Sequence, residues 1–117
     1  MLILTMLLAA CHSSELNIKE LQTVPHKVEK VTKPEYTLQL ISEGEKYTYI
    51  VFHSQETVTA ELELTGNILT IKLDTQPKEN TDLKRYVYKI TRGDAEYDYI
   101  QIKVNGKDSH FDNSTGI

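Results

Sequence analysis

The chain has 117 residues, which is enough for one domain with one modest core. Its 13 lysines and arginines are interspersed with 17 aspartates and glutamates, and the formal net charge is −4. This balance argues against binding to nucleic acid or to an anionic membrane surface. The sequence contains no tryptophan, two phenylalanines and seven tyrosines. Because β-branched and aromatic residues dominate after residue 35, the composition favours strands.

The sequence begins MLILTMLLAAC, with no charged residue from Leu2 to Ala10, and turns polar directly after Cys11. The run is about half of the ~18 to 20 apolar residues that a helix needs to cross a bilayer. A short terminal run that ends in small residues is typical of a secretory signal peptide. We therefore assign residues 1–10 to an export signal.

The last four residues of this stretch, Leu8-Ala9-Ala10-Cys11, resemble the lipobox of bacterial lipoproteins. The resemblance implies cleavage before Cys11 and attachment of a diacylglycerol to its thiol. The mature protein would then be anchored by lipid to the cell membrane of a bacterium, on the extracytoplasmic face. Since Cys11 is the only cysteine, no thiol would remain for a disulfide, a metal site or catalysis.

Residues 11–34 differ in composition from the rest of the chain. They contain Pro25, Pro34 and the charged run HKVEKVTK, with few large apolar groups. We interpret them as the lipidated N-terminus and a flexible tether. A single β domain is expected over residues 35–117.

Three hairpins are predicted within this domain. The clearest spans residues 57–75 and turns at Gly66-Asn67, a dipeptide suited to a two-residue turn. Its register sorts apolar from polar side chains completely, by pairing Leu64 with Leu69, Leu62 with Ile71, Ala60 with Leu73, Glu61 with Lys72 and Glu63 with Thr70.

The other two hairpins are written in the same way. The first turns at Glu43-Gly44, and the third turns at Gly93-Asp94. The predicted pairs are Leu40 with Tyr47, Leu38 with Tyr49 and Tyr36 with Val51 in the first, and Tyr88 with Tyr99, Ile90 with Tyr97 and Lys89 with Asp98 in the third. The link at 76–82 is long enough to pass from one sheet to another, and Asn105-Gly106 marks a last turn. The expected fold is a small antiparallel β-sandwich or partly open barrel of about six to seven strands, built from successive hairpins.

Three Tyr-X-Tyr pairs are the candidate binding residues. Strand side chains alternate, so each pair lies on one face, and the second and third pairs would be neighbours in the third hairpin. A tyrosine face could bind a glycan, a peptide or a partner protein. The alternative is that tyrosine fills the core of a small domain that lacks tryptophan. The pairs are Tyr47 and Tyr49, Tyr86 and Tyr88, and Tyr97 and Tyr99.

Two groups of residues have some features of metal sites. Asp94, Glu96 and Asp98 alternate at a turn, but the glycine and the bidentate glutamate of a calcium-binding EF-hand loop are missing. In the C-terminal segment, Asp108, His110 and Asp112 would share a side of an extended chain, with His53 as a further ligand. A solvated turn and a polar tail explain these groups better, so no metal or other cofactor is expected.

Catalytic groupings are weak. Ser54 follows His53 and Ser109 precedes His110, but neighbours on a strand face opposite ways, so neither pair can act as nucleophile and base. Glu61 and Glu63 share a face, as paired carboxylates of a glycosidase would, although their partners across the hairpin indicate a solvated surface. We therefore expect no enzymatic activity.

The leading hypothesis is a membrane-anchored, non-enzymatic binding module for an envelope protein or a glycan. An inhibitor or immunity-type protein directed against an exported hydrolase or toxin is the first alternative, with the acidic turn and an exposed strand edge as contacts. A carrier of a small molecule or metal is the second alternative.

Overall fold

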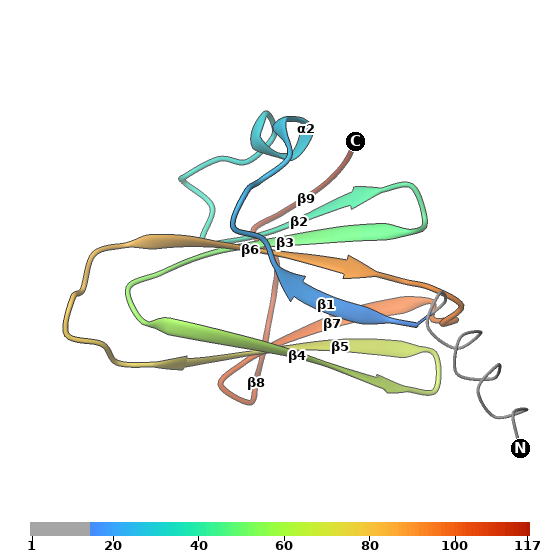
Figure 1. Cartoon of the computed structure of the whole chain (residues 1–117). Coiled ribbons are helices and arrows are strands. Elements are labelled where there is room, and N and C mark those ends of the chain that lie inside the picture. The colour runs from blue at the N-terminus through green and yellow to red at the C-terminus, as the bar shows by residue number, and fades with distance from the viewer. Residues whose placement is uncertain (1–14) are drawn as a thin grey trace, which may run out of the picture.

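A computed structural model describes residues 15–117, and the proposed signal peptide and Cys11 lie outside this range. The described chain forms two facing β-sheets that do not close into a barrel (Figure 1). The all-β sandwich predicted from the sequence is confirmed, with nine strands rather than six to seven. The strands of the five-stranded sheet lie in the order β1 (Asn17–Glu20), β6 (Lys84–Thr91), β3 (Tyr47–Ser54), β2 (Leu38–Glu43) and β9 (Asn113–Gly116). The strands of the four-stranded sheet lie in the order β4 (Thr57–Thr65), β5 (Ile68–Gln76), β7 (Tyr99–Val104) and β8 (Lys107–Ser109).

The β4–β5 hairpin has the predicted register throughout, from Thr57 opposite Gln76 to Thr65 opposite Ile68. Its two-residue turn places Gly66 at a φ of 61°, whereas Asn67 keeps a negative φ. A positive φ at the first turn position alone matches a type II′ turn, which suits the twist of a hairpin. Local sequence was therefore sufficient to define this unit.

The first predicted hairpin exists, but its predicted register is wrong. β2 and β3 pair Leu40 with Ile50 and Leu38 with Phe52, because the turn uses three residues, Gly44 to Lys46. Both faces of these strands are apolar, so sorting apolar from polar side chains does not define the register.

The third predicted hairpin is wrong. β6 pairs with β1 and β3 in one sheet, whereas β7 pairs with β5 and β8 in the other. The segment 92–98 therefore crosses between the sheets, and β7 lies parallel to β5. The fold is thus not purely antiparallel, because β9 also runs parallel to β2.

The remaining connections agree better with the sequence. The link at 76–82 does cross from β5 in one sheet to β6 in the other. Asn105 and Gly106 have φ values of 54° and 79° and form the tight turn between β7 and β8. After β8 the chain returns to the five-stranded sheet, where β9 forms its edge.

The core between the sheets is built from the inward faces of both. It contains mainly aliphatic side chains together with two tyrosines of β6. Their hydroxyls donate hydrogen bonds to the carbonyls of Glu56 and Val58, at the start of β4. The buried residues are Leu38, Ile50, Phe52, Val58, Leu69, Ile71, Leu73, Tyr86, Tyr88, Ile90 and Ile102.

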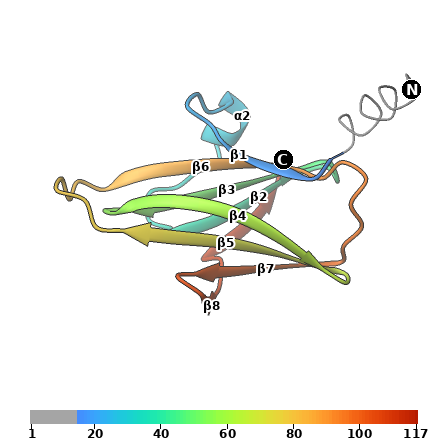
Figure 2. The same cartoon turned by 60° about the horizontal axis from the view of Figure 1, so that its bottom comes forward.

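A second buried cluster lies on the outer face of the five-stranded sheet, under the short helix α2 (His26–Glu29) (Figure 2). Val28 of this helix is fully buried against Ile41, Tyr49, Val51 and Val87. The predicted flexible tether over 11–34 is therefore wrong for its described part. Residues 17–34 supply an edge strand and a cover for the sheet, because their few valines and leucines fit the apolar outer face.

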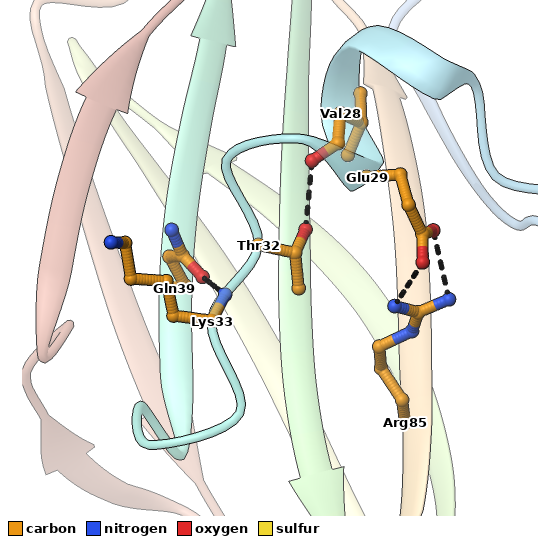
Figure 3. Close-up of polar contacts among 6 residues, drawn as sticks. All are labelled: Val28, Glu29, Thr32, Lys33, Gln39 and Arg85. Atoms are coloured by element: carbon orange, nitrogen blue, oxygen red, sulfur yellow. Dashed lines mark hydrogen bonds and ion pairs between the residues drawn. The ribbon is translucent and has the colours of Figure 1, made fainter.

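Polar contacts hold this cover in place (Figure 3). Arg85 of β6 makes two bonds to the carboxylate of Glu29, at 2.9 and 3.0 Å. Gln39 is only 1% exposed, and its side chain accepts a bond from the N–H of Lys33 and donates to the carbonyl of Val31. No helix within residues 15–117 has the length and apolar character needed to cross a membrane.

Candidate binding surface

The two outer faces of the sandwich are unequal. Helix α2 lies over the outer face of the five-stranded sheet, whereas no helix among residues 15–117 lies over the outer face of the four-stranded sheet (Figure 2). Alternation in β5 and β7 sends Leu69, Ile71 and Ile102 into the core. The residues between them therefore lie on the outer side of the sheet, where Thr70 is only 7% exposed.

A shallow groove of about 270 Å³ lies on this surface. In the parallel register of β5 and β7, Ile68 lies beside Tyr99 and Thr70 beside Gln101. Tyr99 is 63% exposed, which is unusual for a tyrosine in this chain. We name this surface the Tyr99 groove and define it as Tyr99 together with Glu63, Thr65, Ile68, Thr70, Gln101 and Lys103.

The polar groups of the groove are partly ordered by one another. The Gln101 amide donates to the Thr70 hydroxyl at 3.4 Å. The Lys72 ammonium lies 2.8 Å from the Glu63 carboxylate, and its hydrogen bond lowers the pKa of Glu63. The same bond raises the pKa of Lys72. The groove thus offers hydroxyl, amide and paired charged groups beside an exposed aromatic ring, a combination suited to a polar ligand.

A second open hollow, of about 320 Å³, is formed by the 92–98 segment and the β2–β3 turn. Arg92 organises the segment, since its Nε donates to the carbonyl of Ala95 at 2.9 Å and its guanidinium lies 4.3 Å from the centre of the Tyr97 ring. Asp98 accepts a side-chain bond from Asn67 at 3.1 Å. The candidate acidic triplet is therefore an exposed turn, in which Asp98 binds the neighbouring hairpin.

The six candidate tyrosines do not form one face. Tyr86 and Tyr88 lie in the inner core and Tyr49 in the outer cluster, whereas Tyr47 and Tyr97 are half-buried. The predicted contact between the second and third pairs is absent, because β6 and β7 belong to different sheets. Of the six, Tyr99 alone is largely exposed. The alternative interpretation, tyrosine as core filler, is confirmed for Tyr49, Tyr86 and Tyr88.

The buried tyrosines are also bonded within the fold. Tyr49 donates to Glu43 at 2.9 Å, and burial together with this bond raises the Tyr49 pKa to about 12. Burial raises the pKa of Tyr88 as well. The Glu43 carboxylate also accepts a hydrogen bond from Lys27. The bonds from Lys27 and Tyr49 together lower the pKa of Glu43. These phenols therefore contribute to the core and to the attachment of α2.

The second candidate metal group is not assembled. Asp112 accepts a bond from the N–H of Leu38 at 2.9 Å, Asp108 lies 3.9 Å from Lys103, and His110 is exposed. His53 has its Nδ1 2.9 Å from the carbonyl oxygen of Tyr36. Within the part of the chain that the structure describes, no three His, Cys, Asp or Glu residues lie where they could share a metal ion.

The candidate catalytic pairs have local roles. The Ser54 hydroxyl accepts a hydrogen bond from the N–H of Glu56 at 3.0 Å. It thus stabilises the turn after β3 and is not bonded to a histidine within residues 15–117. Glu61 and Glu63 do lie on the outer face, opposite Lys72 and Thr70 as predicted.

Sequence reasoning missed Thr70, Gln101 and Lys103 as members of the surface. Their juxtaposition requires the parallel pairing of β5 with β7, which joins segments about 30 residues apart and cannot be found from hairpin turns. The usable signal was the polar alternation of Tyr99, Gln101 and Lys103 against Ile100, Ile102 and Val104. No family model, curated protein or solved structure matches the chain.

Proposed function

We propose that this protein is a lipid-anchored, extracytoplasmic binding module that recognises a component of the bacterial cell envelope through the Tyr99 groove. The observation that carries the proposal is the uncovered outer face of the four-stranded sheet, where exposed Tyr99 adjoins a groove of hydroxyl, amide and charged groups. The signal-like run and Leu8-Ala9-Ala10-Cys11 support the anchor.

The position of the groove fits a partner near the membrane. Asn17 begins β1 and pairs with Thr91, next to the segment that leads to Tyr99. Five residues lie between Cys11 and Asn17, so the two residues can be at most about 22 Å apart in an extended chain. A lipid on Cys11 would therefore hold the groove end of the sandwich close to the bilayer surface.

Binding suits this groove better than hydrolysis. It is shallow and open, so it cannot exclude water from a reacting centre. Its carboxylate, Glu63, is held ionised by Lys72, whereas a general acid needs a raised pKa. An exposed tyrosine with nearby amide and hydroxyl groups instead provides contact area and adaptable hydrogen bonds.

In-cell photocrosslinking tests the groove. A photoreactive phenylalanine analogue at position 99 should capture a discrete envelope component. The same residue at position 83 should not, although Leu83 is 62% exposed and lies in the link that leads into β6, at the opposite end of the sandwich. Gln101→Ala should reduce the capture from position 99. Equal capture from both positions, or none from position 99, would overturn the proposed surface.

The anchor has its own test. Metabolic labelling with an alkyne fatty acid should mark the native protein and leave Cys11→Ser unlabelled and released from membranes. A Cys11→Ser variant that stays as firmly membrane-bound as the native protein would refute the lipid anchor without bearing on the groove.

A further inference from the structure

Strand β4 is an edge strand that has no bonded neighbour on its outer side among residues 15–117, although β1 of the other sheet approaches it. It is nine residues long, and within residues 15–117 it pairs with β5 alone. Its register with β5 continues from Thr57 to Thr65 without a bulge, and its sequence TVTAELELT contains no lysine or proline. Proteins usually protect long edges with one of these features, because an open edge can pair with another strand.

The main-chain groups of β4 divide into two sets. In an antiparallel hairpin, directly bonded pairs alternate with pairs whose main-chain groups point away from each other. Because the tight turn closes on the bonded pair of Thr65 and Ile68, the N–H and C=O groups of Ala60, Leu62 and Leu64 point away from β5. These groups form the open side of the edge.

Two tyrosines satisfy only the beginning of this edge. The Tyr86 hydroxyl donates to the carbonyl of Glu56 at 3.0 Å, and the Tyr88 hydroxyl donates to the carbonyl of Val58 at 3.3 Å. From Ala60 to Leu64, no hydrogen bond from the described residues reaches the outward side of the strand. The open part of the edge is therefore residues 60–64.

The inward side chains lose their cover over the same residues. Val58 is 5% exposed, Ala60 and Leu62 are half-buried, and Leu64 is 42% exposed. Unpaired main chain thus coincides with apolar side chains whose burial decreases toward Leu64. A further strand beside β4 would satisfy the first and bury the second.

We propose that residues 60–64 of β4 bind an extended segment of a partner protein, in which apolar side chains facing the core alternate with lysine or arginine on the outer face. The outer face of β4 carries Glu61 and Glu63, and the single Lys72 lies opposite Glu61 and forms an ion pair with Glu63. Basic residues directly opposite these glutamates form the favourable cross-strand charge pair.

The same charges disfavour a second copy of this chain as the occupant. A symmetric antiparallel β4–β4 pair centred on Glu61 places that residue opposite its own copy. A pair centred on Leu62 places Glu61 opposite Glu63 of the partner subunit twice. Like charges directly opposite each other are destabilising, so both of these registers carry this penalty. A pair centred on Ala60 avoids it, but it lays the open residues against the start of β4 in the second copy, where the carbonyls of Glu56 and Val58 already accept tyrosine hydroxyls.

This edge shares Glu63 with the Tyr99 groove but does not involve Tyr99 itself, and one synthetic peptide series tests it. The probe is an acetylated and amidated octapeptide of alternating valine and lysine, added to the full chain in detergent micelles. In the proposed complex the valines lie opposite Ala60, Leu62 and Leu64, so their N–H groups face β4 and those of the lysines face away. N-methylation of the valines should weaken binding at least about tenfold, whereas N-methylation of the lysines should leave it within about twofold.

Variants and hydrogen exchange complete the test. Glu61→Lys combined with Glu63→Lys should abolish binding, Tyr99→Ala should leave it unchanged, and a valine–glutamate peptide should not bind. The amides of Ala60, Leu62 and Leu64 should exchange fast in the free protein and slowly with the peptide. Equal binding of both N-methylated peptides would overturn the proposal. Slow exchange of these amides without peptide would also overturn the proposal, because the edge would then already be paired. Its partner would be a second copy if sedimentation shows a dimer, and otherwise another segment of this chain.

Discussion

The substitution Val28→Ala tests whether the segment before β2 belongs to the folded domain. Val28 is fully buried beneath α2, against Ile41, Tyr49 and Val87. The substitution removes two buried methyl groups at about 0.8 kcal/mol each and leaves a cavity, so the free energy of unfolding should fall by about 2 to 3 kcal/mol. For a domain of this size, the loss corresponds to a decrease in Tm of about 10 to 20 °C.

The measurement is urea and thermal unfolding followed by circular dichroism. Lys30→Ala is the control, because Lys30 lies in the same segment and is exposed. It should unfold like the native protein, and the dependence on urea should be unchanged in both variants. If Val28→Ala unfolds within about 0.5 kcal/mol of the native protein, the segment does not pack on the sheet, and the flexible tether predicted from composition is correct.

Three further predictions concern bonds within the fold. The raised pKa of Tyr49 keeps its phenol neutral in the folded protein at a pH where the unfolded phenol already ionises. Its contribution to stability is therefore complete below about pH 10 and is lost as the pH rises through about 12. Tyr49→Phe should remove one late-ionising phenol from an absorbance titration at alkaline pH. Asn105→Ala should lower the free energy of unfolding in urea by about 2 kcal/mol, because Asn105 has a φ of 54° and its side chain makes two hydrogen bonds to Thr75. Asn105→Gly tolerates this φ and should lose only the contribution of the two hydrogen bonds. Gln39→Met should lower the free energy of unfolding by about 2 to 4 kcal/mol in the same assay, because it leaves the N–H of Lys33 and the carbonyl of Val31 without their partner. A decrease near zero would mean that water replaces the amide.

The parts of the fold that could be predicted are those in which neighbouring residues decide the structure. The β4–β5 register follows from one turn and one sorted face, and the Asn105-Gly106 turn follows from two residues that tolerate positive φ. Neither needs information from elsewhere in the chain. The all-β class follows from composition and alternation for the same reason.

The third hairpin failed because its turn signal was compatible with two structures. Gly93 has a positive φ of 62°, as a hairpin turn would require, but the segment around it bends across the sandwich. The apolar residues on both faces of β6 were the better guide, since they indicated a central strand covered on two sides. β6 does lie between β1 and β3, with Val87 under the α2 segment and Tyr88 in the core.

The candidate site was recovered only in part. Tyr99 was among the predicted binding residues, but the reason given for it, a shared face with Tyr88, does not hold. Its actual neighbours come from β5 through a parallel pairing, and such a pairing depends on the packing of both sheets rather than on any local turn. A shallow binding surface that arises from tertiary pairing leaves almost no local pattern in the sequence.

Docking of the α2 segment also changes what the proposed anchor would allow. A flexible chain from Cys11 to residue 34 would let the domain turn freely and sample a wide layer above the membrane. With β1 paired to β6 and Val28 buried, a tether could extend at most from Cys11 to the start of β1 at Asn17. The Tyr99 groove and the open part of β4 lie at the end of the sandwich where β1 begins, so both would face a narrow zone next to the bilayer. A partner held in that zone, such as an integral membrane protein or another lipid-anchored protein, satisfies this geometry better than a component that is remote from the membrane.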